Sequence, residues 1–414
     1  MKNKLAINGG QRTIKNEKEH YTWPNITEKT EKAVYNQLNK EISIYTRSGI
    51  IEEFETSLSS YFKINHCLLT NSGTSALHSM FVGANIQKDD EILCPVYTHF
   101  ATVTPLFQIG AIPVLVDCDE SGNIDVNEME KNITPKTKGI VVTHMWGIPC
   151  NMDTILIIAK KHNLMVFEDA SHAVGATYKQ KKVGTFGYSS AFSLQAKKAV
   201  TGGEGGVFLT KNTNAYYRAL LLGQPRRSEV EIPKNHSLHE YTLTGMGLKY
   251  RIHPLAAVIA NEQFNNLENL LAGRRRVAKI LKKGLGQLPG IKFPIIQKNV
   301  EPSWYSFVIQ YESSELGGLS ISKFNDALKA EGCKEASRNI FTPPLTHFQL
   351  FQNPGKLFHE YSGKFAYAKE SFPNAEKFYN NAIKLPGWYN PKNEFINLYI
   401  KAFKKVVDNY KELL

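Results

Sequence analysis

Residues 139–173 decide the fold, and they read GIVVTHMWGIPCNMDTILIIAKKHNLMVFEDASHA. Two short apolar runs, Gly139–Thr143 and Met165–Glu168, lie on either side of a segment with helical periodicity, Thr154–Asn163. Short strands separated by a helix of this length are typical of a βαβ unit with parallel strands. The stretch therefore predicts an α/β fold with a mainly parallel sheet.

The same alternation continues on both sides of this stretch, from about residue 50 to residue 210. We expect further strands at His66–Leu69, Glu91–Cys94, Pro113–Asp117, Ser189–Ser193 and Gly206–Leu209, and further helices at Thr74–Ala84, Thr102–Gln108 and Val126–Lys131. Sheets of this kind bind ligands in the loops outside the carboxyl ends of their strands. The functional site is therefore expected in those loops.

The C-terminal third has a different pattern. A long helical pattern runs from about Pro254 to Leu285, preceded by a polar, irregular segment, Gly223–Gly247, which predicts a long loop. Beyond it we expect a strand at Trp304–Glu312 and helices at Ser322–Glu331 and within Asn393–Leu413. We expect a large domain over residues 26–260, a smaller α+β domain over residues 261–414, and an N-terminal arm, residues 1–25, packed beside the smaller domain.

The composition of the chain indicates a globular protein. With 414 residues, 42% of them hydrophobic and 21% charged, the chain is typical of globular proteins. No apolar run approaches the ~18 residues of a membrane-spanning helix, and Met1–Glu19 lacks the apolar core of a signal peptide. We therefore expect a cytoplasmic protein with no membrane partner.

The net charge of +12 favours anionic ligands. The positive charge is dispersed, so nucleic acid is not expected as a partner, and the densest run, Arg274–Arg276, is interpreted as the solvated face of a helix. The five cysteines have no C-x-x-C spacing. We therefore expect reduced thiols and no metal site.

A candidate phosphate site lies at a junction between a strand and a helix, in Asn71-Ser72-Gly73-Thr74-Ser75. The glycine lets the backbone approach a ligand, and the hydroxyl groups and free N–H groups at a helix N-terminus suit a phosphate. The same residues are also a good helix cap, and this alternative stays open.

Two acids follow the apolar strand that ends at Phe167, in the order Glu168-Asp169-Ala170-Ser171-His172. An acid at the carboxyl end of a parallel strand lies at the edge that binds ligands, where it could pair with a protonated ring nitrogen. The alternative is that Asp169 caps a helix.

Two lysines, Lys197 and Lys198, precede a glycine-rich segment, Thr201–Gly206. Desolvation would lower the pKa of such a lysine and make its amine a nucleophile for a carbonyl, whereas the alternative is an ordinary surface lysine pair. A phosphate site, an acid for a pyridinium nitrogen and a lysine for an aldehyde are together what pyridoxal 5′-phosphate requires.

With these residues, the sequence resembles the DegT/StrS family of aminotransferases, which use pyridoxal phosphate and have the aspartate-aminotransferase-like fold (fold type I). The resemblance covers nearly the whole chain. The matching segments are residues 5–10, Trp23-Pro24, Phe54-Glu55, and residues 71–77, 95–102, 144–147, 168–173, 192–198, 202–206, 250–251 and 254–257. The resemblance implies a seven-stranded, mostly parallel sheet flanked by helices and a smaller α+β C-terminal domain.

The resemblance also implies roles for individual residues. Lys198 matches the Schiff-base lysine and proton shuttle, five residues after the phosphate-contacting serine, here Ser193; Lys197 is one residue off register. Asp169 matches the acid that keeps the pyridine nitrogen protonated, and His172 matches a position near the ring hydroxyl. Gly73 and Thr74, with Ser72 adjacent, match the phosphate cradle.

Two positions depart from the family pattern. His99 lies where the family usually has an aromatic residue that stacks on the cofactor ring. Lys249 lies where the family often has an asparagine that reaches the cofactor phosphate of the neighbouring subunit. A lysine can still serve a phosphate as a point charge. The resemblance therefore implies a homodimer with shared active sites.

Four further residues carry open interpretations. His144 and Trp146 follow a strand, so they either line the pocket or pack in the core. Arg226 and Arg227 lie in the segment that is expected to be a loop, and solvent exposure is favoured over contact with an anionic substrate.

The expected reaction is a ping-pong transamination from glutamate or glutamine to the keto group of a keto-deoxysugar that is linked to a nucleotide. A keto-cyclitol such as an inosose is the alternative acceptor. A regulatory protein that binds pyridoxal phosphate without turnover is a further alternative. A related sugar dehydratase has histidine at the lysine position, and Lys198 argues against it.

Overall fold

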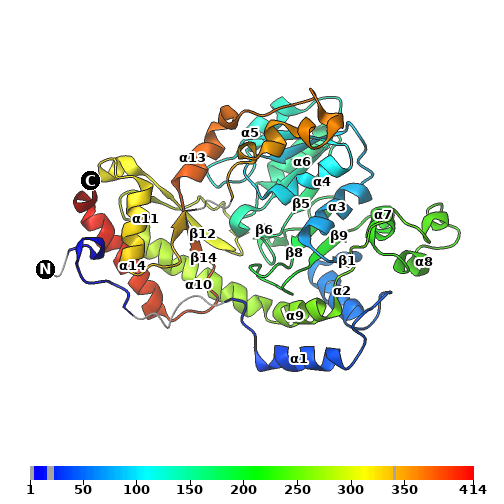
Figure 1. Cartoon of the computed structure of the whole chain (residues 1–414), viewed down its shortest axis with the longest axis horizontal. Helices are drawn as coiled ribbons and strands as arrows, with labels where there is room; N and C mark the ends of the chain where they lie inside the picture. The colour runs from blue at the N-terminus through cyan, green and yellow to red at the C-terminus, as the bar shows by residue number, and fades with distance from the viewer. Residues whose placement is uncertain (1–3, 16–22, 339–341) are drawn as a thin grey trace.

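A seven-stranded sheet forms the centre of the computed structural model, which describes residues 4–15, 23–338 and 342–414 (Figure 1). Its strands, in spatial order, are β1 (His66–Thr70), β9 (Gly206–Thr210), β8 (Ser189–Ser193), β5 (Met165–Asp169), β4 (Thr137–Thr143), β2 (Glu91–Pro95) and β3 (Ile112–Val116). Strand β9 is antiparallel to both its neighbours, and the other pairs are parallel. The predicted α/β fold with a mostly parallel seven-stranded sheet is confirmed.

Alternate residues of each strand enter different apolar cores, because successive side chains point to opposite faces of a sheet. In β4, Val141 packs into the core with α3 and α7, whereas Ile140 and Val142 pack into the core with α6. The helices of this part of the chain are α2 (Gly49–Phe62), α3 (Gly73–Gly83), α4 (Thr104–Gln108), α5 (Val126–Met129), α6 (Met152–Lys161), α7 (Thr213–Gly223) and α8 (Arg227–Glu231). Helices therefore flank both faces, as expected.

A second sheet lies in the C-terminal part of the chain, in the order β10 (Ile291–Lys292), β12 (Ser306–Tyr311), β14 (Ala382–Pro386) and β13 (Ser337–Arg338). Helices α10 (Leu267–Leu285), α11 (Ile321–Ala330) and α14 (Asn393–Asp408) share one apolar core with this sheet. Leu5 is buried in the same core, and the N–H of Ala6 donates to the buried Glu331 carboxylate at 2.8 Å. Residues 1–3 and 16–22 of the expected N-terminal arm lie outside the described residues.

Shorter elements complete the chain. Helix α1 (Glu28–Leu38) lies at the edge of the molecule in Figure 1, whereas α12 (Gln349–Gln352) and α13 (Pro373–Asn381) pack Phe351 and Phe378 into the core of the seven-stranded sheet. A small three-stranded sheet joins β11 (Val300–Glu301), β6 (Thr177–Tyr178) and β7 (Lys181–Lys182). All five cysteines are buried and unpaired. Across the described parts of the chain, no helix is both long and apolar enough to cross a membrane.

Two expectations about the C-terminal half need correction. The helical pattern at 254–285 is two helices, α9 (Pro254–Asn265) and α10, because Asn266 between them leaves helical geometry and donates from its side chain to the Tyr389 hydroxyl at 3.0 Å. Arg274 is not on a solvated face. It is buried and donates from Nε to the Gly387 carbonyl at 3.1 Å.

Candidate functional site

Three of the predicted elements meet at the carboxyl edge of the seven-stranded sheet. Ser72 and Gly73 follow β1, Asp169 ends β5, and Ser193 ends β8. These three strands run in the same direction, so their carboxyl ends lie at one edge. The predicted phosphate, acid and lysine segments are therefore neighbours in space.

The cradle segment is both a helix cap and an open donor site. The Ser72 hydroxyl accepts from the Ser75 N–H at 3.0 Å, which caps α3. The N–H groups of Gly73 and Thr74 belong to the first helical turn, so they have no partner within the helix. The capping interpretation and the phosphate interpretation are therefore compatible, because different N–H groups serve each.

Glycines bring the backbone close together at this point. A Cβ atom at Gly73 would lie 2.7 Å from the Cβ of Ser193, so only glycine lets the cradle contact the end of β8. A Cβ atom at Gly206 would lie 2.2 Å from the carbonyl oxygen of Ser72. The glycine-rich segment after the lysine pair thus packs directly against the cradle.

The adjacent acids of β5 face in opposite directions. Both carboxylate oxygens of Glu168 accept hydrogen bonds from the backbone. The donors are the N–H groups of Gly184, Phe186 and Gly187, at 2.6–2.7 Å. His144 Nδ1 accepts from the Cys150 N–H at 3.1 Å, so Nε2 carries the proton and donates to Glu168 at 3.2 Å. His144 is therefore a buried structural residue and does not line the pocket.

Asp169 lies on the other face of the strand, toward Thr102 and Ser171. It accepts from the Thr102 hydroxyl at 2.6 Å and from the Ser171 N–H at 3.0 Å. Because Thr102 donates to Asp169, it accepts from Thr98 at 2.8 Å, and Thr98 accepts from Thr143 at 2.9 Å. The next element after Asp169 is strand β6, so the alternative that this acid caps a helix is wrong.

The two lysines differ in environment. Lys197 is exposed, whereas burial lowers the pKa of Lys198 to about 8, with Asp169 opposing that shift and Lys384 adding to it. Lys198 Nζ lies 4.8 Å from the centroid of the Tyr305 ring. The Trp23 indole N–H donates to the Lys198 carbonyl at 3.0 Å and so anchors the backbone of this turn.

Stacked rings line the cleft beside Lys198. The His172 ring lies 4.1 Å from the Tyr305 ring at an interplanar angle of 6°, and 5.7 Å from the Trp146 ring. His172 Nδ1 is buried and has no hydrogen-bond partner among the described residues. Burial, followed by the charge of Lys198, holds the pKa of His172 well below its usual value, so the ring is neutral.

His99 and Lys249 lie at the rim of the site. His99 Nδ1 accepts from the Ala101 N–H at 3.2 Å, and burial, followed by the charge of Lys198, lowers the pKa of this histidine. Lys249 is exposed, and its carbonyl accepts from the Asn71 side chain at 3.4 Å, beside the cradle of its own chain.

Three residues of the cleft were not predicted from the sequence: Thr102 as the partner of Asp169, Tyr305 and Lys384. Lys384 Nζ lies 5.8 Å from the centroid of the Trp146 ring. Tyr305 and Lys384 come from the C-terminal part of the chain, more than 100 residues from Lys198 in the sequence. No local pattern indicates such contacts, so only the fold could reveal them.

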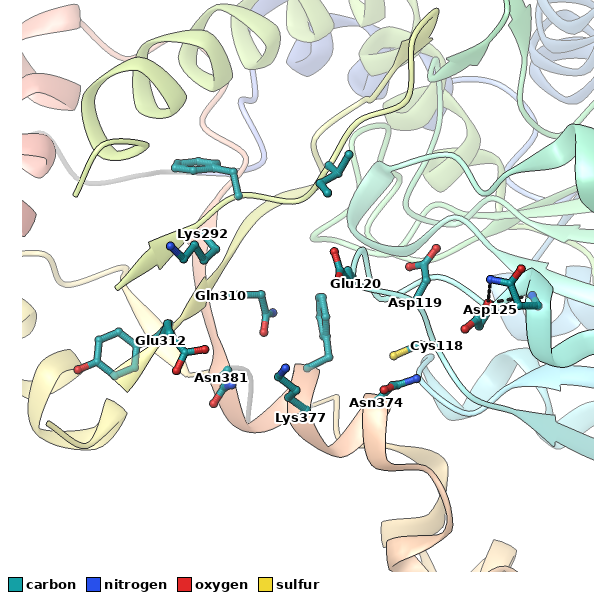
Figure 2. A pocket seen from close by; sticks show the side chains of 15 residues that line it. Cys118, Asp119, Glu120, Asp125, Lys292, Gln310, Glu312, Asn374, Lys377 and Asn381 are labelled. Carbon is teal, nitrogen blue, oxygen red and sulfur yellow. Dashed lines mark hydrogen bonds between the residues drawn. The ribbon is translucent and has the colours of Figure 1, made fainter. Parts of the chain in front are cut away.

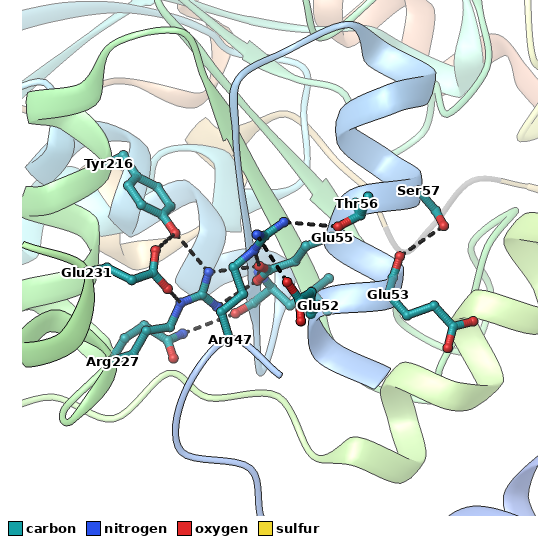
Figure 3. A network of polar contacts seen from close by, with 11 residues as sticks. Arg47, Glu52, Glu53, Glu55, Thr56, Ser57, Tyr216, Arg227 and Glu231 are labelled. Carbon is teal, nitrogen blue, oxygen red and sulfur yellow. Dashed lines mark hydrogen bonds and ion pairs between the residues drawn. The ribbon is translucent and has the colours of Figure 1, made fainter. Parts of the chain in front are cut away.

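The expectation that Arg227 is solvated is wrong. Figure 3 shows its guanidinium between Glu55 and Glu231, where it donates to both oxygens of Glu55 at 2.8 Å. Tyr216 and Arg47 complete this network, and Arg227 is buried within it. Arg226 is exposed, as expected. Arg227 is a structural residue and is not available to a substrate.

A separate cavity of about 570 Å³ lies between β12, α13 and the loop after β3 (Figure 2). It contains none of the predicted site residues. Asp125 caps α5, Asp119 closes a turn by accepting from Ser121 and Asn123, and Lys292 forms an ion pair with Glu315. The charged groups around this cavity mostly stabilise local structure.

The residues around Lys198 fit pyridoxal phosphate. They offer N–H groups at the α3 N-terminus that have no partner within the helix for the phosphate, the Asp169 carboxylate for the ring nitrogen, and a lysine whose pKa of about 8 leaves part of it as free amine. A ring hydroxyl bound in this cleft would also supply the hydrogen-bond partner that His172 Nδ1 lacks among the described residues.

Comparisons with known proteins agree with this geometry. The model of the DegT/DnrJ/EryC1/StrS aminotransferase family matches residues 24–403. The spore coat polysaccharide biosynthesis protein SpsC of Bacillus subtilis is 30% identical over 361 residues, which are 86% of this chain and 89% of SpsC. A GDP-perosamine synthase of Caulobacter vibrioides is 37% identical over 239 residues, 58% of this chain and 62% of that protein.

An aminocyclitol enzyme and a solved structure extend the comparison. The L-glutamine:2-deoxy-scyllo-inosose aminotransferase of Micromonospora echinospora is 27% identical over 375 residues, 87% of this chain and 86% of that protein. The structure of PseC of Helicobacter pylori, an aminotransferase involved in the biosynthesis of pseudoaminic acid, has a TM-score of 0.79 and 25% identity, covering 94% of this chain and 99% of PseC. The chain therefore belongs to the DegT/DnrJ/EryC1/StrS aminotransferase family and is an aminotransferase that uses pyridoxal phosphate.

Proposed function

We propose that this protein transfers an amino group from glutamate or glutamine to the keto group of a deoxysugar linked to a nucleotide. The observation that carries the proposal is the convergence of Lys198, Asp169 and the N-terminus of α3 in one cleft. Relatives that are named for sugar products, such as GDP-perosamine synthase, support this class of acceptor. The net charge of +12 suits an anionic nucleotide.

Pyridoxal phosphate, when bound, supplies an electron-withdrawing ring that holds the amino group between two half-reactions. Ser72, Gly73, Thr74 and Ser193 hold its phosphate in this proposal. Their N–H and hydroxyl groups donate hydrogen bonds, and the positive end of the α3 dipole favours the charge. Asp169 would pair with the ring nitrogen, and its carboxylate would keep that nitrogen protonated.

Lys198 would hold the cofactor through its amine and, as a free amine, would carry the proton to and from the substrate carbon that bears the amino group. A pKa of about 8 suits this task, because an acid–base group works best when its pKa lies near the working pH. His172 is neutral, so its Nδ1, which has no partner in the part of the chain that the structure describes, would donate to or accept from the ring hydroxyl. His99, at the rim of the site, would stack on the ring.

We further propose that two copies of the chain form a dimer with shared active sites. Leu243 is 80% exposed, and Tyr241, Met246 and Leu248 are also exposed, although all four side chains are large and apolar. They immediately precede Lys249 in the sequence. A second copy that covers these side chains brings Lys249 to the partner's cofactor phosphate.

Absorption spectroscopy tests the first half of the reaction. The purified protein with bound cofactor is mixed with glutamate or glutamine in the absence of any acceptor. We expect the visible absorption band to disappear and one equivalent of the corresponding 2-oxo acid to form. A visible band that ignores both donors would contradict the proposal and favour a regulatory role.

Acceptors are then offered to the aminated protein. A nucleotide-linked 4-keto-6-deoxyhexose is expected to restore the visible band and to be converted to the product that carries H and NH2 in place of the keto oxygen, as detected by mass spectrometry, whereas scyllo-inosose is expected to do neither. Restoration by the inosose alone would overturn the sugar acceptor and favour the cyclitol alternative.

A further inference from the structure

Lys384 lies on the face of the second sheet that is turned toward the seven-stranded sheet. On β14, Ile383 and Leu385 pack into the C-terminal core, whereas Ala382 packs into a core shared with the seven-stranded sheet. Lys384 is two residues from Ala382 and therefore lies on the same face of β14. Its partner on β12, Val308, packs into that shared core as well. Because side chains alternate along a strand, Lys384 points toward the cleft.

Two lysines therefore reach one stack of rings. Lys384 Nζ lies 5.8 Å from the Trp146 centroid, and Lys198 Nζ lies 4.8 Å from the Tyr305 centroid. The Trp146 and Tyr305 rings are joined through His172, which stacks on both. The two ammonium groups consequently face the same small volume beside the reacting centre.

Lys384 has no counterion among the described residues, where no carboxylate lies within ion-pair distance of it. Burial and the nearby charge of Lys197 lower its pKa. The Trp146 indole N–H is also buried without a hydrogen-bond partner among those residues. A half-buried ammonium without a counterion is costly, so its presence together with a buried N–H donor that has no partner among the described residues points to an anionic ligand.

We propose that Lys384 binds the α-carboxylate of the amino donor, an inference that rests on the function proposed above. In an amino acid, the amine and the carboxylate are attached to the same carbon atom. An amine that reacts beside Lys198 therefore places its carboxylate within a few ångströms, in the volume that Lys384 faces. The diphosphate of a nucleotide-linked sugar is attached several bonds away from a reacting ketone, so it fits this volume less well.

The test compares Lys384→Met with the wild type and with Arg338→Met as a matched control. Arg338 lies on the neighbouring strand β13, opposite Ile383, so its side chain is on the other face of the sheet. Binding of 2-methylglutamate, which has no α-hydrogen to transfer, is measured by the change it causes in the cofactor spectrum. Loss of a charge-assisted hydrogen bond predicts a Kd about 10- to 100-fold higher in Lys384→Met and unchanged in Arg338→Met.

A second ligand isolates the carboxylate. 4-Aminobutyrate has the amine and the distal carboxylate of glutamate but lacks the α-carboxylate. We expect the Kd of 4-aminobutyrate, measured by the change it causes in the cofactor spectrum, to be the same in Lys384→Met and the wild type, whereas KM for glutamate or glutamine rises. Lys384→Arg, which keeps a positive charge, is expected to recover most of the lost affinity.

Distinct results would overturn the inference. An equal loss with 4-aminobutyrate would show that Lys384 does not act through the α-carboxylate, and a rise in KM for the sugar acceptor alone would assign Lys384 to the acceptor. Failure of the proposed function is recognised separately, because the wild type would then react with neither glutamate nor glutamine. A normal cofactor spectrum in Lys384→Met shows that the variant is folded.

Discussion

Two buried charged clusters of this protein are built in opposite ways. Around Glu55, every charged group has partners: its oxygens accept from Arg227, Arg47 and the Leu69 N–H, and Arg227 also donates to Glu231 and Tyr216 (Figure 3). Around Lys198, by contrast, Lys384 has no counterion and two buried ring nitrogens have no hydrogen-bond partner among the described residues.

The fully paired Glu55 cluster stabilises the fold, whereas the incompletely paired groups around Lys198 are suited to bind a ligand. The Glu55 cluster ties α2 to β1 and α8, and so supports the strand that leads into the phosphate cradle. The pKa shifts follow the same division. Although burial opposes it, Glu55 raises the pKa of Arg227 and keeps it charged, whereas burial lowers the pKa of Lys198. Unsatisfied polar groups mark the place where a ligand completes the structure.

The largest expected effect separates the two lysines of the cleft. Lys198→Ala removes the group that attacks the cofactor and moves the proton, so we expect at least a roughly 10²- to 10⁴-fold loss of activity and loss of the visible absorption band. Lys197→Ala, at the exposed neighbour, is expected to keep both. The reverse result would move the site by one residue.

We expect a substitution in the Glu55 cluster to lower the free energy of unfolding and to leave the activity of the folded protein unchanged. Glu55→Gln leaves the buried Arg227 without its main counterion, which predicts a loss of about 3–5 kcal/mol in the free energy of unfolding. Denaturant unfolding measures this loss, and activity per folded molecule is expected to stay near that of the wild type. A Glu55→Gln protein that is as stable as the wild type but inactive would contradict the structural role of the Glu55 cluster.

Thr102 tests whether the Asp169 carboxylate must be held in place. Thr102→Val removes the hydroxyl that donates to Asp169, so we expect an activity about 10- to 100-fold lower with little change in stability. Thr102→Ser keeps the hydroxyl and serves as the control. Equal activity of the valine and wild-type proteins would show that the hydroxyl chain does not position Asp169.

The pKa of Lys198 gives the smallest predicted effect. With a pKa of about 8, the neutral amine increases from about a tenth at pH 7 to about nine tenths at pH 9. The rate at which cofactor-free protein takes up pyridoxal phosphate should therefore rise about tenfold over this range and level off above it. A rate that keeps rising in proportion to hydroxide up to pH 10 would mean that the lysine is not desolvated.

The seven strands of the main sheet could be predicted from the sequence because each is a short run between helical patterns or glycine-containing turns. The strand β14 could not, because Lys384 interrupts its apolar run and its partners lie far away in the sequence. The same residue explains why the cleft was incompletely predicted. Contacts of Lys384 and Tyr305 with the ring stack depend on how the C-terminal sheet packs against the seven-stranded one.

The partners and burial of charged side chains are a second feature that could not be predicted from the sequence. A pair of adjacent acids, Glu168 and Asp169, indicates a site at the end of a strand, but not that three backbone N–H groups occupy Glu168. Similarly, Arg227 and Arg274 look solvated by their neighbours in the sequence, although both are buried by distant segments. Local pattern predicts the element; burial of a charge is decided by tertiary packing.

The most direct test of the central claim is to find the lysine that carries the cofactor. The protein with bound pyridoxal phosphate is reduced with borohydride, digested and examined by mass spectrometry. We expect the pyridoxyl mass on Lys198 alone. The same mass on Lys197, on Lys384 or on no lysine would contradict this assignment.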